Sequence, residues 1–123
     1  MSKRILVIDD KHEIRALVCK YLNKKGFHAF RAKNAWQGIL LARRFTPDLI
    51  LLDINMPLIN GFTVLKHLKD NEKTAYIPTI MLTGRSDDDS KERASGLYAE
   101  HYITKPFDLE ELYAVINKIV GSP

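Results

Sequence analysis

Three short segments of the chain are almost continuously apolar. They lie at residues 5–8 (ILVI), 49–52 (LILL) and 77–82 (IPTIML), and branched aliphatic residues dominate them. Short apolar runs that do not alternate with polar residues are typical of strands covered on both faces, as in a parallel sheet. Weaker strand signals lie at residues 28–32 and 101–103, so we expect five strands.

Segments with helical spacing separate these strands. Apolar residues recur every three or four positions after the first, second, third and fifth strands, whereas a polar stretch at residues 88–97 follows the fourth. The boundary residues agree, because Gly26 follows the first helix, Asn60-Gly61 opens the third and Asp108 can cap the last. The periodic positions are Ile14, Val18, Tyr21 and Leu22; Ala35, Ile39, Ala42 and Phe45; Val64, Leu65 and Leu68; and Leu109, Leu112, Ile116 and Ile119.

Strand and helix therefore alternate five times. Parallel strands require crossover connections that cover the sheet, so this order predicts a doubly wound α/β fold: a five-stranded parallel sheet with five helices distributed over both faces. In such folds, ligands bind beyond the carboxyl ends of the strands. Polar residues that gather at several strand ends would therefore mark a site.

Composition narrows the class of protein. The 123 residues, 46% of them apolar and 28% charged, suit one globular domain spanning residues 1–123. The lone Cys19 cannot form an internal disulfide, no apolar run approaches the roughly 18 residues of a membrane span, and the first residues do not resemble a signal peptide. We therefore expect a soluble, cytoplasmic protein.

The net charge of +4 is unevenly distributed. Residues 1–44 hold eleven Lys and Arg against three Asp and Glu, whereas residues 45–123 hold eight against twelve. The basic residues fall mostly on expected helix faces or loops, where a solvated surface explains them, and a docking surface for an acidic partner is the alternative. We expect no direct nucleic-acid binding.

Polar residues stand at the carboxyl ends of four expected strands. Asp9 and Asp10 end the first strand, Asp53 the third and Thr83 the fourth, and Lys105 follows the fifth. Taken singly, each could be a helix cap, a turn residue or an exposed charge. Their joint placement along one edge of the sheet favours a site.

Three carboxylates in one place repel one another unless a cation lies between them. Oxygen ligands without converging His or Cys residues favour Mg²⁺, which pairs readily with phosphate oxygens. A carboxylate can attack phosphorus, while a metal ion, a lysine and a hydroxyl neutralise charge on the phosphoryl oxygens. The set therefore predicts phosphoryl transfer.

The sequence resembles the receiver domains of two-component response regulators over essentially its whole length. The matching motifs are IDD at residues 8–10, PDLILLDINMP at 47–57 with NG at 60–61, MLTG at 81–84 and YITKPF at 102–107. The resemblance implies a flavodoxin-like sheet with the strand order 2-1-3-4-5.

The resemblance also implies a role for each site residue. Asp53 matches the phosphoacceptor, which takes its phosphoryl group from a histidine kinase or a histidine phosphotransfer protein. Asp10 matches a direct Mg²⁺ ligand, Asp9 a ligand that acts mainly through water, and the Asn55 backbone carbonyl a further ligand.

Further roles follow from the same resemblance. The Thr83 hydroxyl and the Lys105 ammonium match the groups that bind the phosphoryl oxygens, and the Lys105-Pro106 bond is expected to be cis. Thr83 and Tyr102 match a switch pair that changes the surface of the fourth helix, fifth strand and fifth helix, where a downstream protein target would bind. The basic first and second helices would receive the kinase. A monomer or a phosphorylation-dependent dimer is expected.

Several alternatives stay open on sequence alone. Phosphatases of the haloacid dehalogenase type need a second Asp where this chain has Asn55, so we expect no enzyme activity beyond the domain's own phosphotransfer and slow autodephosphorylation. Asn55 and Arg85 stand at positions that tune dephosphorylation in receiver domains, and the usual Asp before the third-helix glycine is Asn60 here. A phosphorylation-independent interaction module and a receiver fragment of a longer transcriptional regulator are the other interpretations.

Overall fold

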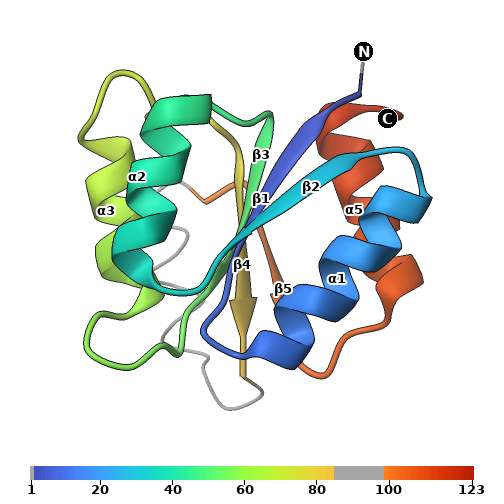
Figure 1. Cartoon of the computed structure of the whole chain (residues 1–123), viewed down its shortest axis with the longest axis horizontal. Helices are drawn as coiled ribbons and strands as arrows, with labels where there is room; N and C mark the ends of the chain where they lie inside the picture. Colours follow the sequence, from blue (N-terminus) through green and yellow to red (C-terminus); the bar gives the residue numbers. More distant parts are fainter. Residues whose placement is uncertain (1, 85–98) are drawn as a thin grey trace.

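Five parallel strands form one sheet in the order β2-β1-β3-β4-β5 (Figure 1). The computed structural model of the chain describes residues 2–84 and 99–123. The predicted strands and their order are confirmed. Their bounds are β1 (Arg4–Ile8), β2 (His28–Ala32), β3 (Leu49–Asp53), β4 (Thr79–Thr83) and β5 (His101–Thr104).

The predicted fourth strand begins two residues too early. Pro78 has no N–H to donate to a neighbouring strand, and the N–H of Ile77 donates to the Thr74 carbonyl at 3.1 Å within the preceding turn. The strand therefore starts at Thr79, although the Pro78 carbonyl still accepts from Ile50 N at 3.0 Å.

The helices of the described part of the chain follow the predicted spacing. They are α1 (His12–Lys24), α2 (Ala35–Phe45), α3 (Gly61–Lys69) and α5 (Leu109–Val120). The helix expected at residues 88–97 lies outside the described residues. The predicted cap at Asp108 accepts a hydrogen bond from Glu110 N at 2.9 Å, and Asn60 accepts one from Thr63 N at 3.1 Å.

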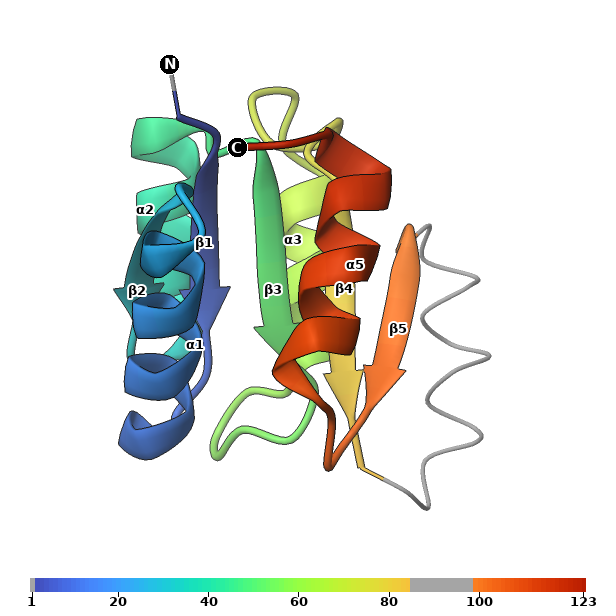
Figure 2. The ribbon, with the colours of Figure 1, turned by 90° about the vertical axis from the view of Figure 1, so that its right-hand side faces the viewer.

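Alternation along the strands divides the interior into two cores. Helices α2 and α3 cover one face of the sheet, and α1 and α5 cover the other (Figures 1 and 2). On the α2 and α3 side, the strands contribute Leu6, Ile8, Ala32, Ile50, Leu52 and Met81. On the α1 and α5 side, they contribute Ile5, Val7, Leu49, Leu51, Ile80, Leu82 and Ile103. Successive strand residues therefore point into different cores.

The chain changes direction across the sheet at β1. After β1 the chain crosses to β2 on one side, and after β2 it returns past β1 to β3 on the other. The connections that leave β1 and β3 diverge to opposite faces, which opens a crevice at the carboxyl ends of these two strands. No helix in residues 2–84 and 99–123 is long and apolar enough to cross a membrane.

Candidate functional site

Adjacent strands bring three carboxylates together. β1 and β3 pair in parallel with Ile8 opposite Leu52, so that Asp9 and Asp10 after β1 lie beside Asp53 at the end of β3. One carboxylate oxygen of each aspartate lies within 4.8 Å of those of the other two. Asp9 and Asp53 are fully buried, whereas the side chain of Asp10 is 28% exposed. We call these three residues the acidic cluster.

A glycine lets the next helix start directly against this strand. A Cβ atom at Gly61 would lie 2.5 Å from the Asp53 carbonyl oxygen and 2.7 Å from Ile54 Cα, closer than real Cβ atoms approach backbone. The Gly61 N–H donates to the Ile54 carbonyl at 2.8 Å. Gly61 therefore holds the start of α3 against the end of β3, so that the loop of residues 54–60, which carries Asn55, begins and ends at the same place.

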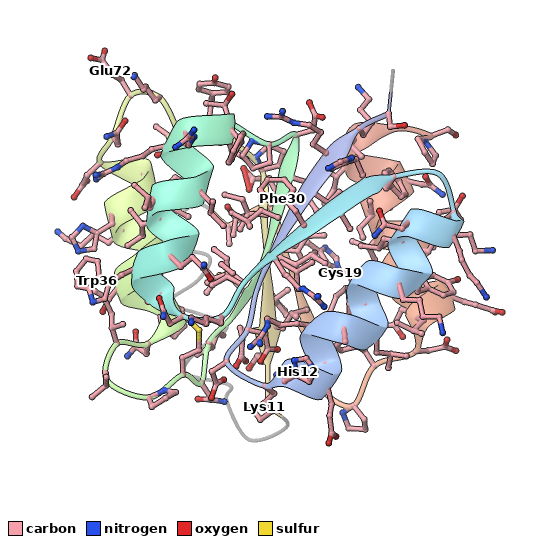
Figure 3. All side chains as sticks on the ribbon, in the orientation of Figure 1. Lys11, His12, Cys19, Phe30, Trp36 and Glu72 are labelled. Carbon is pink, nitrogen blue, oxygen red and sulfur yellow. The ribbon has the colours of Figure 1, made fainter. Side chains whose placement is uncertain are left out.

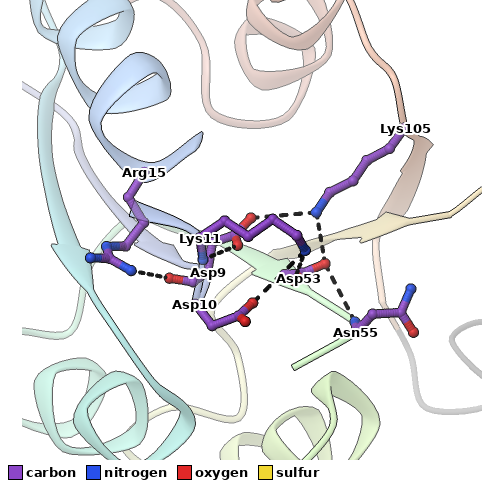
Figure 4. A network of polar contacts seen from close by, with 7 residues as sticks. All are labelled: Asp9, Asp10, Lys11, Arg15, Asp53, Asn55 and Lys105. Carbon is purple, nitrogen blue, oxygen red and sulfur yellow. Dashed lines mark hydrogen bonds and ion pairs between the residues drawn. The ribbon is translucent and has the colours of Figure 1, made fainter. Parts of the chain in front are cut away.

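Lys105 points into the acidic cluster from the loop after β5 (Figure 4). Its ammonium donates to Asp53 Oδ1 at 2.9 Å and lies 3.5 Å from Asp9 Oδ2. The backbone N–H of Lys105 donates to the Thr83 carbonyl at 2.6 Å, and the Lys105-Pro106 bond is cis. Lysine and carboxylates from three strand ends thus meet in one place.

The other sequence-predicted residues lie around this centre. Asn55 N–H donates to Asp53 Oδ1 at 3.4 Å, and its side chain is exposed. Thr83 is buried at the carboxyl end of β4, one position beyond the residue paired with Asp53, and its hydroxyl donates to the Gly84 carbonyl at 3.2 Å. Tyr102 lies on the edge strand β5 with 42% of its surface exposed.

The structure adds two basic residues that sequence reasoning missed. The Lys11 ammonium lies 4.0 Å from Asp10 Oδ1 and 3.9 Å from Asp53 Oδ2. The Arg15 guanidinium donates to the Asp9 carbonyl at 2.8 Å from the first turns of α1. The position of Lys11 directly after the two aspartates was a usable signal, whereas nothing in the helical spacing shows where Arg15 points.

Burial dominates the electrostatics of Asp53. Desolvation raises the pKa of this carboxyl above its usual value, the hydrogen bond and charge of Lys105 oppose the rise, and the nearby Asp9 adds to it. The raised pKa means that an ionised Asp53 is a strained group, which a further cation or a covalent change would relieve.

The acidic cluster fits a hard divalent cation. Its donors are all oxygens, the ligands that Mg²⁺ prefers. Asp10 Oδ1 and Asp53 Oδ2 are buried and accept no hydrogen bond within the described residues, which is unusual for buried carboxylate oxygens. A cation held between Asp10 and Asp53 would satisfy both.

Comparisons with known proteins agree with this arrangement. The family model described as response regulator receiver domain matches residues 5–117 of the chain. This chain is a response regulator receiver domain.

Solved receiver domains share the fold. Over 97% of its length, the chain superposes on 99% of the Vibrio cholerae chemotaxis protein CheY4 with a TM-score of 0.91 at 25% identity. It also superposes with a TM-score of 0.91 and 25% identity on a putative response regulator from Chloroflexus aurantiacus, with 98% of each chain covered.

Curated relatives fall into two lengths. The transcriptional regulator RpaA of Synechocystis is 39% identical over 95% of this receiver domain, and PhoB of Escherichia coli is 38% identical over 98%. The receiver domain spans 48% of RpaA and 52% of PhoB, about half of their lengths. By contrast, PilH of Pseudomonas aeruginosa, at 35% identity over 96% of this chain, is matched over 98% of its own length.

Replacing Asp53 by asparagine should stabilise the receiver domain in metal-free buffer at pH 7. The folded-state pKa of Asp53 is raised above its unfolded value, so this group favours folding below the unfolded pKa and loses that contribution as pH rises through the folded pKa. Asp53→Asn should therefore melt at a higher temperature than wild type at pH 7, with a difference that shrinks as the pH falls towards about 4. Thermal denaturation in EDTA across this pH range measures it.

Asp70→Asn is the matched control. Asp70 is exposed at the end of α3 and pairs with Lys66 at 3.9 Å, so removing its charge relieves no desolvation. Asp53→Asn melting below wild type at pH 7 would show that the Lys105 contact outweighs the burial cost.

Proposed function

We propose that Asp53 accepts a phosphoryl group from a phosphohistidine of a partner kinase or phosphotransfer protein, and that the modification switches an output surface. One observation carries this proposal: Asp53 is a buried carboxylate with the Lys105 ammonium at 2.9 Å, inside a cluster with Asp9 and Asp10. Such an arrangement suits a nucleophile that reacts with an anionic phosphoryl group while a cation is bound beside it.

The two oxygens of Asp53 have different surroundings. Oδ1 accepts hydrogen bonds from Lys105 and from the Asn55 N–H, whereas Oδ2 accepts none within the described residues. The two oxygens therefore suit different partners: Oδ2 is placed to hold the metal ion, and Oδ1, with Lys105 against it, is placed to bond to phosphorus. In the transfer, a bond forms between the carboxylate oxygen and phosphorus, the phosphorus–nitrogen bond to the partner's histidine breaks, and the imidazole leaves with that electron pair.

Charge on the transferred group has to be neutralised. Lys105 already points at Asp53 and would follow a phosphoryl oxygen, and the Thr83 hydroxyl at the end of β4 would donate to another. Asp10, Asp53 and the Asn55 carbonyl would hold Mg²⁺, with Asp9 acting through water. When bound, the metal ion supplies positive charge to the phosphoryl oxygens.

Acetyl phosphate tests the assignment without a partner kinase. Incubation with acetyl phosphate and Mg²⁺ should add one phosphoryl group to the wild-type protein, and none to Asp53→Asn, because the nucleophilic oxygen is lost. Intact-mass spectrometry reads both, and peptide mapping after borohydride reduction locates the modified residue. Asp48→Asn, a change at an exposed aspartate that accepts from Arg4 N at 2.7 Å, serves as the control and should label normally. Equal labelling of wild type and Asp53→Asn would place the nucleophile elsewhere.

A groove beside the site is the proposed contact for the phosphodonor. A cavity of about 400 Å³ lies between α1 and the loop after β5, with Leu17 on one wall and Phe107 on the other. Leu17 is 55% exposed, which is high for a leucine beside a groove, and Lys105 lines the same cavity. A helix seated there would carry its histidine to the Asp53 side of the groove. Around it, the basic residues of α1 would favour an acidic partner surface.

Leu17→Ala should slow phosphotransfer from a histidine kinase by about 5- to 30-fold, the effect of losing one buried interface anchor. Labelling by acetyl phosphate should not change, because Leu17 is not part of the acidic cluster. Leu40→Ala removes a similarly exposed leucine from α2 and should leave both rates unchanged, because α2 covers the other face of the sheet (Figure 1) and the input surface proposed here is limited to α1 and the groove. To choose the phosphodonor, histidine kinases encoded in the same genome are compared, and the kinase that phosphorylates the wild-type protein fastest is then used with wild type and both variants. Equal loss in Leu40→Ala would contradict the groove assignment.

The output would be read near β5 and α5. A phosphoryl group on Asp53 gives the Thr83 hydroxyl a new acceptor, and its movement would leave room for Tyr102 to turn inward from its half-exposed position. The surface formed with the expected fourth helix would then change, and a downstream protein would bind it.

Amide hydrogen exchange with and without beryllofluoride tests this switch. We expect changes in exchange between Thr83 and Lys105 when the phosphoryl analogue binds, with smaller changes in α1 and α2. Asp53→Asn, which cannot bind the analogue through its carboxylate, is the control. Changes confined to residues 1–44 would mean that phosphorylation acts instead by masking the input face.

We further propose that the domain catalyses only its own phosphorylation and its own slow dephosphorylation. Asn55 stands where a haloacid dehalogenase type phosphatase needs an aspartate for acid–base catalysis, and an amide cannot exchange that proton. The resemblance to PhoB and RpaA favours a second role, as the regulatory half of a transcriptional regulator, in which this domain itself makes no contact with DNA.

A further inference from the structure

A second ammonium faces the acidic cluster. Lys11 follows Asp10 directly, and its Nζ lies 4.0 Å from Asp10 Oδ1 and 3.9 Å from Asp53 Oδ2 (Figure 4). Lys105 approaches the cluster from the loop after β5 and contacts different oxygen atoms, at 2.9 Å from Asp53 Oδ1 and 3.5 Å from Asp9 Oδ2. The two lysines therefore divide the oxygens of the cluster between them.

The carboxylate oxygens that face Lys11 lack hydrogen-bond donors. Asp10 Oδ1 and Asp53 Oδ2 are the two buried carboxylate oxygens of the cluster that accept no hydrogen bond within residues 2–84 and 99–123. At 3.9 to 4.0 Å, Lys11 attracts them by charge without donating a hydrogen bond. These oxygens belong to the two aspartates that would hold the metal ion directly.

We propose that Lys11 is a tethered cation that competes with a divalent metal ion for Asp10 and Asp53, and so sets the metal concentration at which the receiver domain becomes competent. This inference rests on the proposed metal site. Lys11 is a positioning residue here, because it acts on the metal ligands and makes no contact with the reacting phosphorus.

The side chain of Lys11 is free to give way. It is 52% exposed, compared with 19% for Lys105, and its stem can rotate into solvent at little cost. The backbone of Lys11 stays in place, since its N–H donates to Asp9 Oδ1 at 2.9 Å. A metal ion between Asp10 and Asp53 would repel an ammonium held within 4 Å of the same oxygens, so the two cations exclude each other.

Magnesium titration of charge-removing and charge-conserving variants tests the competition. Lys11→Met keeps most of the stem and removes the charge, so it should bind Mg²⁺ with a Kd about two- to fivefold below that of wild type, the size expected for an exposed ion pair. Lys11→Arg should stay within about twofold of wild type. Lys24→Met removes the same charge from the exposed last turn of α1 and should leave the Kd unchanged. Amide chemical shifts of residues 9–11 and 53–55 follow binding.

Thermal stability supplies a readout independent of phosphorylation. In EDTA, Lys11→Met should melt about 1 to 4 °C below wild type, because the cluster loses a neutralising charge. In saturating Mg²⁺ the difference should vanish or reverse, since the metal ion then takes the place of the ammonium. Lys11→Gln repeats both measurements with a polar uncharged side chain.

The outcomes separate the two levels of the proposal. No Mg²⁺ binding by wild type would overturn both the metal site and the role of Lys11. Binding by wild type that Asp10→Ala abolishes, together with an unchanged or higher Kd in Lys11→Met, would overturn only the role of Lys11. A lower Kd in Lys11→Met but not in Lys24→Met supports it.

Discussion

Repulsion between buried carboxylates is the constraint on which the site depends. Three aspartates with oxygens within 4.8 Å of one another repel pairwise by about 3 to 4 kcal/mol at an effective dielectric constant of about 20. Lys105 offsets part of this repulsion through Asp53 and Asp9, and Arg15 holds the Asp9 carbonyl in place. A cation bound between the carboxylates would relieve the repulsion that remains.

The sheet supplies the strength to hold this strained cluster. β1 and β3 are central strands whose residues from Ile5 to Ile8 and from Leu49 to Asp53 are all buried, so their ends cannot move apart without disrupting both cores. The close start of α3 at Gly61 adds a contact with the backbone of Asp53 and Ile54. The side chains of the candidate site therefore stand either at the last position of a strand, as Asp53 does, or directly after a strand, as Asp9 and Lys105 do.

Much of this could be predicted from sequence, because strand ends in a parallel sheet share an edge. The runs at residues 5–8 and 49–52 located the ends at Asp9 and Asp53, and the strand order implied by the resemblance to receiver domains put them side by side. The early start predicted for β4 was wrong because Pro78 cannot donate to its neighbour. The position of Lys11 directly after Asp10 was a usable signal that it lies near the cluster. The contact of Arg15 with the Asp9 carbonyl could not be predicted, because helical spacing does not show the direction in which a long side chain extends. Distances within the cluster, and thus the division of oxygens between two lysines, also need coordinates.

The alternation of strand side chains between two cores limits where residues can be inserted in this domain. Since neighbouring strand residues enter different cores, inserting one residue in the middle of β3 would turn the strand residues after it to the opposite face and move Asp53 out of register with Asp9. A residue added at the exposed tip of the turn between α3 and β4, beside Glu72 (Figure 3), would disturb neither face. A change of strand length therefore displaces the acidic cluster, whereas a change of length at an exposed turn leaves it in place.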